Sequence, residues 1–330
     1  MFFESFFLFL INFFITSSLS PILQKIGSKL GLIDSPDFRK INKRSLVRVG
    51  GISFIASFII SCVILVFFTK YNLLINNEYK NFIAISIIIS LLSFLLGFAD
   101  DLKSLSPFFR LSMQIIISAF VWTCGIQITN IDISFLRLDT EFIQLSRFIS
   151  FLLTIIWITG ITNAINWIDG LDGLASSIVG VSAISLGVLF IGEGNIQEGL
   201  VLIGISGSCL GFLIFNRYPA KLIMGDGGSY FLGFNLGYLS ILGSSSFLVS
   251  DSFNIHTQKL HIFILIFLIP LFDMAYVILV RLLKGLSPFY PDNNHIHHRL
   301  INFGLTHDKV VRFLTVINII ICISSLVILL

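Results

Sequence analysis

Residues 82–101 read FIAISIIISLLSFLLGFADD, an apolar run that ends in two adjacent aspartates. A run of this kind is typical of a helix that crosses a bilayer, because about 20 apolar residues span the hydrocarbon core. The two carboxylates then mark the place where the chain reaches the membrane edge. The segment predicts a helical membrane protein and a polar site where its helices end.

The composition of the whole chain supports this fold class. Hydrophobic residues make up 55% of the 330 residues and charged residues 12%, whereas a soluble domain carries about 25% charged residues. We expect an all-α polytopic integral membrane protein with about ten transmembrane helices in a single domain, residues 1–330. The predicted spans cover approximately residues 5–23, 50–69, 82–98, 111–128, 148–165, 174–192, 198–215, 230–248, 261–283 and 311–330.

The sequence predicts neither a cleaved signal peptide nor a special role for the cysteines. Met1–Ser20 lacks a basic start, and no small-x-small cleavage site precedes Pro21, so we expect a retained first span. No CxxC pair is present, so the sequence predicts neither a disulfide framework nor a zinc site. The cysteines all fall inside predicted spans and are expected to pack as small apolar residues: Cys62, Cys124, Cys209 and Cys322.

Basic residues are unevenly divided between the two sides of the predicted bundle. The loops after spans 1, 3, 5, 7 and 9 share one side and hold all but five of the 21 Lys and Arg residues. The five on the other side are Lys70, Lys80, Arg137, Arg147 and Lys259. By the positive-inside rule, the odd-numbered loops face the cytoplasm. Because the polar clusters fall in or beside these loops, we expect one assembled site there.

Asp100 and Asp101 form the first cluster, at the end of the third predicted span. Adjacent carboxylates at a membrane edge repel each other and are costly to desolvate. A divalent cation removes both penalties, because Mg²⁺ binds carboxylate and phosphate oxygens together. The alternative is a solvated helix end, and the pair alone does not decide between the two interpretations.

The second cluster is the segment NAINWIDGLDG, residues 163–173. Asn163 and Asn166 are three residues apart and are predicted to share one helical face. The Asp169-Gly and Asp172-Gly pairs then break the helix and let the backbone approach a ligand closely. These side chains suit a nucleobase, a ribose or a metal-bound water. An Asx-turn between two spans is the alternative, but it rarely needs two Asn and two Asp-Gly pairs.

The third cluster, MGDGGS at residues 224–229, places one carboxylate among glycines. Asp226 on a tight turn suits a metal ligand, with backbone N–H groups free for phosphate. If Ser229 caps the following helix, the helix dipole adds to anion binding. Taken alone this Gly-rich loop is weak evidence, and the two other acidic clusters strengthen it.

The fourth cluster is HIHHR, residues 295–299. Three His residues suit zinc, but no Cys or further His completes a closed site. We expect a water-exposed cluster in a loop, in which Arg299 binds the oxygens of a nucleotide diphosphate. A polar loop without function is the alternative.

The remaining polar features are less informative. Anchoring on anionic lipid explains most of the basic loop at 37–48, and Gly50-Gly51 predicts close helix packing behind it. Asp273 lies mid-span near Pro270, where a carboxylate is expected to be paired or functional. Residues 129–147 alternate as a short hairpin on the opposite face.

The clusters, in this order, resemble those of the polyprenyl-phosphate N-acetylhexosamine-1-phosphate transferases. That family includes the translocase that makes the first lipid intermediate of peptidoglycan and the initiators of O-antigen and enterobacterial common antigen. The resemblance implies a metal-dependent exchange: a UDP-sugar and undecaprenyl phosphate give undecaprenyl-diphospho-sugar and UMP. The matching stretches lie between residues 31 and 300: GLIDSPDFRK, GFADDLKSLSP, NAINWIDGLDGLASS, NRYPAKLIMGDGGSYFLGF and PDNNHIHHRL.

The resemblance also implies roles for individual residues. Asp100 and Asp101 are the catalytic acidic pair near the metal and the lipid phosphate, and Asp226 with Asp101 binds Mg²⁺ or Mn²⁺. The residues implied in substrate binding are Asn163, Asn166, Asp169 and Asp172 at the nucleotide, His297, His298 and Arg299 at the diphosphate and sugar, and Lys43 ahead of the Gly-Gly pair.

The implied partners are undecaprenyl phosphate, a UDP-N-acetylhexosamine and membrane lipids, with no nucleic acid. The implied location is the bacterial inner membrane, with the active site facing the cytoplasm, and a homodimer is allowed. An enzyme of this kind initiates O-antigen, in lipopolysaccharide biosynthesis, or another cell-surface polysaccharide. The last three residues of the fourth cluster, His297, His298 and Arg299, favour an N-acetylhexosamine over the muramyl pentapeptide as the transferred group. Which N-acetylhexosamine it is stays open. Asn42 departs from the family, which often has His there.

Two other classes of protein fit these motifs less well. An ion-coupled transporter also places carboxylates in spans, but it usually shows inverted repeats and helices broken at mid-depth. A CDP-alcohol phosphotransferase also uses Asp-Gly pairs in a membrane. In this chain Asp172-Gly173 is followed by Leu-Ala-Ser-Ser instead of the Ala-Arg that such an enzyme needs.

Overall fold

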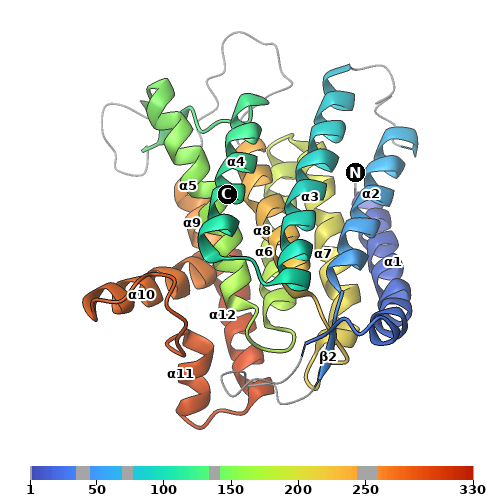
Figure 1. Cartoon of the computed structure of the whole chain (residues 1–330). Helices are drawn as coiled ribbons and strands as arrows, with labels where there is room; N and C mark the ends of the chain where they lie inside the picture. Colours follow the sequence, from blue (N-terminus) through green and yellow to red (C-terminus); the bar gives the residue numbers. More distant parts are fainter. Residues whose placement is uncertain (1, 35–44, 69–76, 134–141, 244–258, 330) are drawn as a thin grey trace.

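The structure is a computed structural model that describes residues 2–34, 45–68, 77–133, 142–243 and 259–329. It is a bundle of long helices with two small sheets at its ends (Figure 1). The helices are α1 (Phe2–Lys29), α2 (Gly51–Phe68), α3 (Asn77–Lys103), α4 (Pro107–Thr123), α5 (Arg147–Ile168), α6 (Leu174–Gly192), α7 (Ile196–Asn216), α8 (Gly225–Leu242), α9 (Leu260–Ile266), α10 (Leu268–Leu283), α11 (Ile296–Asn302) and α12 (His307–Leu329).

Helix α8 occupies the centre of the bundle. Every residue of α8 except Asp226 is buried, and the helix packs against α2, α3 and α5. Aromatic contacts such as Phe54 with Phe231 join it to α2. Because α8 is surrounded by other helices, it tolerates the Gly, Ser and Asn residues that a lipid-facing helix would avoid. Its one partly exposed residue, the carboxylate Asp226, therefore lies at the end where the bundle opens.

The predicted fold class agrees with the structure, but the predicted count of about ten spans is not supported. Among the described residues, six helices are long and apolar enough to cross a membrane: α1, α3, α5, α6, α7 and α12. The apolar helices α2 and α4 are shorter, and α8 is rich in small polar residues. A hydropathy count taken from the sequence does not separate such buried helices from lipid-facing spans.

The predicted span 261–283 is interrupted in the structure. Helices α9 and α10 meet at Phe267 with a bend of 83°, three residues before Pro270. If this bent pair crosses the membrane once, the number of candidate spans rises to seven. Figure 1 shows α10 lying across the direction of the long helices, with α11 and α12 following it.

A three-stranded sheet connects two distant parts of the chain. Its strands are β1 (Ile33–Asp34), β2 (Leu46–Arg48) and β5 (Leu222–Ile223), and β2 pairs with β5 in parallel. The predicted close packing behind β2 is confirmed: a Cβ atom on Gly51 would lie 2.5 Å from the backbone nitrogen of Gly228. The sheet therefore brings the α1–α2 connection against the start of α8.

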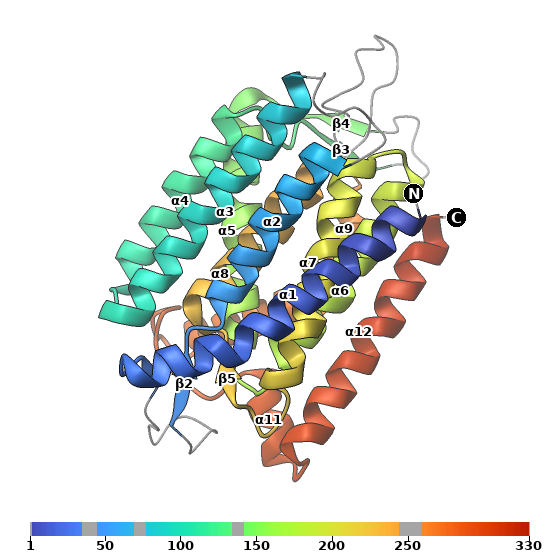
Figure 2. The same ribbon diagram turned by 90° about the vertical axis from the view of Figure 1, so that its right-hand side faces the viewer.

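The predicted hairpin is present at the other end of the bundle. Strands β3 (Asn130–Asp132) and β4 (Phe142–Gln144) pair antiparallel, with Ile131 opposite Ile143. Figure 2 shows this hairpin far from β2 and β5, on the opposite side of the helix bundle. The two ends of the molecule are thus chemically different, because the acidic clusters gather only around the β2–β5 end of the described chain.

Candidate active site

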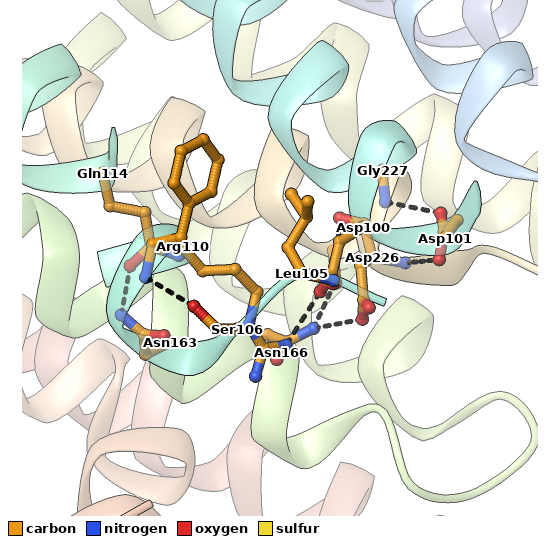
Figure 3. Close-up of polar contacts among 12 residues, drawn as sticks. Asp100, Asp101, Leu105, Ser106, Arg110, Gln114, Asn163, Asn166, Asp226 and Gly227 are labelled. Carbon is orange, nitrogen blue, oxygen red and sulfur yellow. Dashed lines mark hydrogen bonds and ion pairs between the residues drawn. The ribbon is translucent and has the colours of Figure 1, made fainter. Parts of the chain in front are cut away.

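Asp101 binds the first turn of α8. Its Oδ1 accepts the N–H of Asp226 at 2.8 Å, and its Oδ2 accepts the N–H of Gly227 at 2.9 Å (Figure 3). Free N–H groups at a helix N-terminus favour a negative charge, and a carboxylate satisfies them. Position 97 of α3 must be a glycine, because a Cβ atom on Gly97 would lie 2.1 Å from the carbonyl oxygen of Asp226. Close packing of α3 on α8 therefore creates this contact.

The start of α8 differs from the sequence expectation. The helix begins at Gly225, whose φ of +73° lies in the left-handed region that favours glycine. Residues 225–229 are thus the first turn of the helix instead of a loop before it. Ser229 does not cap the helix; it lies buried inside α8 and donates to the carbonyl oxygen of Asp226.

Arg48 joins two carboxylates of the site. Its Nε lies 2.7 Å from Asp101 Oδ1, and its Nη2 lies 2.8 Å from Asp226 Oδ2. Burial alone would lower the pKa of Arg48, but Asp226, Asp101 and Asp34 outweigh it and raise that pKa above its ordinary value. Sequence analysis assigned most of the basic loop that contains Arg48 to lipid anchoring, left open that some of its residues face the substrate, and gave Arg48 no role of its own. Its role depends on the β2–β5 pairing, for which the sequence carries no clear signal.

Asp100 faces away from its neighbour. Its Oδ2 lies 2.8 Å from Arg110 Nη1 in α4, and its Oδ1 accepts the N–H of Leu105 at 2.7 Å. Successive residues on a helix do not point the same way, so the adjacent carboxylates bind different partners. Both side chains are only 4% exposed. This burial rules out the interpretation of the pair as a solvated helix end.

Asn166 adds an amide to the carboxylate cluster. Its Nδ2 donates to Asp226 Oδ1 at 2.8 Å and to Ser229 Oγ at 2.9 Å. One turn earlier, Asn163 donates to Gln114 Oε1 of α4 at 2.7 Å. The prediction that both Asn side chains share a helical face is confirmed, because both line the same cavity. Gln114 is a contact that the sequence motifs did not indicate.

The two Asp-Gly pairs end α5 as predicted, but their carboxylates diverge. Asp169 caps the C-terminus of α5; burial and nearby Asp226 raise its pKa well above the ordinary value, against the influence of Arg48. Asp172 instead accepts the N–H of Ala220 at 2.9 Å. Asp169 therefore belongs to the acidic cluster, whereas Asp172 holds the loop that follows α7.

The His cluster packs beside this turn, and two expectations about it are wrong. Residues 296–302 form the short helix α11 instead of a loop, and His297 is buried, with 1% of its surface exposed. A Cβ on Gly170 would lie 2.3 Å from His297 Nε2, so this glycine admits the imidazole. Burial, with His298 and His295 nearby, lowers the pKa of His297 well below its ordinary value.

Asp273 and Arg299 stabilise the position of α11. Asp273 Oδ2 lies 2.7 Å from His295 Nδ1, and its Oδ1 accepts the N–H of Ile296 at 2.6 Å. This confirms that the mid-span carboxylate is paired. The guanidinium of Arg299 lies 4.8 Å from the ring centre of Tyr276 in α10. Lys43, the remaining predicted site residue, lies outside the described residues.

A cavity of about 290 Å³ opens beside the carboxylates, between α4, α5, α8 and α10. Arg110, Asn163 and Asn166 give it a polar end next to Asp100 and Asp226. Its other walls are largely apolar, with Ile156, Leu111, Met274, Ile278 and Phe289 among the lining residues. The cavity therefore suits an amphipathic ligand that carries a charged group at one end.

The acidic cluster fits a divalent cation that is shared with a substrate. Within the described residues, no three ligating side chains already surround one point. Mg²⁺, however, usually takes only one or two carboxylates and completes its shell with water and substrate phosphates. Asp101 and Asp226 already converge on one positive group, the guanidinium of Arg48. These hard oxygen donors are of the type that Mg²⁺ or Mn²⁺ binds.

Sequence comparisons show which known proteins this chain resembles. The model of the family described as Glycosyl transferase family 4 matches residues 82–244. A probable undecaprenyl-phosphate N-acetylglucosaminyl 1-phosphate transferase of Bacillus subtilis is 32% identical over 97% of this chain and 83% of its own length. An undecaprenyl-phosphate alpha-N-acetylglucosaminyl 1-phosphate transferase of Haemophilus influenzae is 28% identical over 90% of this chain and 79% of its own.

Proposed function

The chain belongs to glycosyl transferase family 4, among the polyprenyl-phosphate N-acetylhexosamine-1-phosphate transferases, and we propose that its donor is UDP-N-acetylglucosamine. The enzyme transfers a sugar 1-phosphate to undecaprenyl phosphate. The choice of N-acetylglucosamine is supported by the names of the relatives from Bacillus subtilis and Haemophilus influenzae. The transporter alternative is not favoured.

The convergence of Asp101, Asp226 and Arg48 at the start of α8 is the observation that carries the proposal. Phosphoryl transfer depends on positioning and on neutralising the charge of the phosphates. This end of α8 combines oxygen donors for a cation with a fixed guanidinium. The diphosphate of the donor therefore binds here, with Asn166 as a neighbouring hydrogen-bond donor.

The acceptor lipid binds in the cavity beside this cluster. Undecaprenyl phosphate is a long apolar chain with a charged end, and the cavity has apolar walls with Arg110 at its polar end. In this position the lipid phosphate lies next to Asp100 and Asn166. Arg110 then pairs with the phosphate as well as with Asp100, which holds the attacking oxygen toward the donor.

Transfer proceeds directly between the two phosphates. An oxygen of the lipid phosphate attacks the β-phosphorus of the donor, the bond to the bridging oxygen breaks, and UMP leaves. The second pKa of a phosphate monoester is about 6, so the nucleophile is largely ionised at neutral pH and needs little help from a base. A divalent cation, held by Asp101 and Asp226, would neutralise charge on the diphosphate oxygens. Asp100 and Arg110 position the nucleophile.

The membrane orientation is also part of the proposal. Basic residues such as Arg48, Arg110 and Arg217 lie at the same end of the bundle as the acidic cluster. By the positive-inside rule, this supports a site at the cytoplasmic face of the bacterial inner membrane. A sugar nucleotide is available on that side. The lipid-linked product then enters the assembly of a cell-surface polysaccharide, with residues 1–330 acting as one transferase domain.

The function is tested by measuring UMP release from purified protein with undecaprenyl phosphate and a panel of UDP-sugars. We expect UDP-N-acetylglucosamine to give the highest rate, and omission of the lipid to abolish release. Release with another N-acetylhexosamine alone would revise the sugar but keep the reaction. No release with any donor, in a protein that remains folded, would contradict the proposed activity.

A further inference from the structure

A second and larger cavity lies away from the carboxylate cluster. Its volume is about 730 Å³, and it is bounded by the start of α6, the end of α7, the loop 217–221 and the first turns of α12. Figure 2 shows α12 at the edge of the bundle, beside α6. The reaction proposed above uses none of its basic residues. The cavity therefore needs an explanation of its own.

The residues that line this cavity change from apolar to basic toward the end of α7. Ile214 and Val316 lie inside the candidate spans of α7 and α12 and are 47% and 53% exposed. Arg217 and Lys221 lie just past Asn216, the last residue of α7. An apolar wall at membrane depth that ends in basic residues at the helix ends matches the profile of a lipid, from acyl chain to headgroup.

The charge of the rim favours an anion. Among the residues that the structure describes, neither Arg217 nor Lys221 forms an ion pair, and both are exposed. Arg312 pairs with Asp308 one turn earlier in α12, and Asp172 is hydrogen-bonded to Ala220. Two basic side chains therefore remain to bind a phosphate at the mouth of the cavity.

The wall that carries these basic residues is fixed to the rest of the protein. Asn216 accepts the N–H of Gly173 at 3.0 Å and donates to the carbonyl oxygen of Leu222 at 3.0 Å. The rings of Tyr218 and His307 stack with centres 4.4 Å apart. The loop 217–221 is thus held between α6 and α12. A site whose walls are already in place needs little ordering when it binds a headgroup.

We propose that this cavity binds an anionic phospholipid, with its phosphate on Arg217 and Lys221 and one acyl chain against Ile214 and Val316. A nucleotide would leave the exposed apolar wall uncovered, so we favour a lipid. Polyprenyl phosphate shares the phosphate chemistry. A membrane phospholipid is favoured because this cavity lies on the α7–α12 side of the turn 169–173, whereas the acceptor cavity lies between α4, α5 and α10.

Native mass spectrometry of the full chain in detergent tests the proposal. The probes are dioleoyl phosphatidylglycerol and dioleoyl phosphatidylcholine, and the retained lipid is counted for the wild type and for the variant Arg217→Gln/Lys221→Gln. We expect one tightly retained phosphatidylglycerol in the wild type. Retention in the variant should be roughly thirtyfold weaker, because each of the two basic residues near an anionic headgroup contributes about 1 kcal/mol and about 1.4 kcal/mol corresponds to a factor of ten.

The matched control is Lys25→Gln/Lys29→Gln, which removes two exposed basic residues at the end of α1. It should retain phosphatidylglycerol like the wild type. Equal retention of the two lipids, or equal loss in the control, would overturn the proposal because it would indicate unspecific attraction. Displacement of the lipid by UMP or by one equivalent of undecaprenyl phosphate would also overturn it and assign the cavity to a substrate.

A second variant tests the site without changing the loop 217–221, so that a misfolded loop cannot explain the result. Val316→Trp fills the apolar wall without changing any charge, and its unfolding temperature is measured beside that of the wild type. We expect it to fold and to lose phosphatidylglycerol selectively. Full retention of the lipid in this variant would show that the acyl chain lies elsewhere, and the proposed site would be wrong.

Discussion

The acidic site has two halves, one around Asp101 and one around Asp100, and these adjacent residues have different partners. Asp101 faces α8, where it meets Arg48 and the N–H groups of Asp226 and Gly227. Asp100 faces α4, where it pairs with Arg110, a residue that lines the largely apolar cavity. We call these the α8 half and the α4 half. In the proposed function, the α8 half binds the sugar nucleotide and the α4 half binds the lipid.

Neutralising each carboxylate separately gives the largest expected effect. Asp101→Asn should lower turnover by roughly 1000-fold and Asp100→Asn by roughly 100-fold, because preorganised groups at such a site contribute several kcal/mol. In the proposed mechanism, Asp101 holds the start of α8 and the cation, whereas Asp100 acts through Arg110. UMP release per folded protein measures both losses.

Asp132→Asn is the control for this pair, because Asp132 is a buried carboxylate at the opposite end of the bundle. It should keep its turnover per folded molecule. Raising the pH should restore neither site variant, since the lipid phosphate is already largely ionised. A greater loss for Asp100→Asn than for Asp101→Asn would reverse the assignment of the halves.

The α4 half is tested by Arg110→Gln. Because Arg110 lines the cavity and pairs with Asp100, we expect the KM for undecaprenyl phosphate to rise about tenfold, as when one partner of a buried charge pair is lost. The KM for the UDP-sugar should change little. Arg110→Lys should recover part of the affinity. An equal rise in both KM values would mean that Arg110 only supports the fold.

The α8 half is tested by Arg48→Gln with stability as the readout. Arg48 neutralises Asp101 and Asp226, so its loss should lower the unfolding temperature in EDTA by about 5 °C. Mg²⁺ should then stabilise the variant more than the wild type, because the cation and the guanidinium neutralise the same carboxylates. Equal stabilisation of both proteins by Mg²⁺ would place the cation elsewhere.

The smallest expected effect concerns His297, which packs against Gly170 in the turn 169–173. Its folded pKa lies well below its ordinary value, near 6.5 in the unfolded chain. The unfolded state therefore binds more protons between these two pKa values. The contribution of neutral His297 is complete above pH 6.5 and is lost as the pH falls below it, by up to about 1.4 kcal/mol per pH unit.

Thermal unfolding of the wild type and His297→Gln between pH 5 and pH 7.5 measures this effect. The wild type should lose more stability on acidification than the variant. His298→Gln is the matched control, because His298 is only half-buried in the same helix and should leave most of the pH dependence in place. Parallel profiles for wild type and His297→Gln would contradict the burial of a neutral imidazole.

The sequence predicts where the acidic clusters lie along the chain, but not which partner each carboxylate faces. The apolar run before Asp100 and the Asp-Gly pairs after Asn166 fix the helix ends, and hydropathy detects such ends well. The direction of each carboxylate depends on which helix packs against it. Asp172 shows the consequence, because it turns to Ala220 although it lies only three residues from Asp169.

Contacts between distant segments explain what sequence analysis missed. Arg48 reaches Asp226 only because β2 pairs with β5, and two short strands carry too little pattern to be recognised. Helix α8 is buried at the centre of the bundle and contains small and polar residues. Its first turn, residues 225–229, therefore has the composition of a loop. The same burial misled the count of spans, because an enclosed helix need not be apolar throughout.

The central claim is that the cluster at the start of α8 holds the diphosphate and its cation. UMP release from UDP-N-acetylglucosamine and undecaprenyl phosphate, measured against free Mg²⁺ for wild type and Asp226→Asn, tests it most directly. We predict that wild-type release requires Mg²⁺ and stops in EDTA, and that Asp226→Asn loses at least about 100-fold in rate at every Mg²⁺ concentration. Undiminished release in EDTA, or a near-normal rate in Asp226→Asn, would contradict the claim.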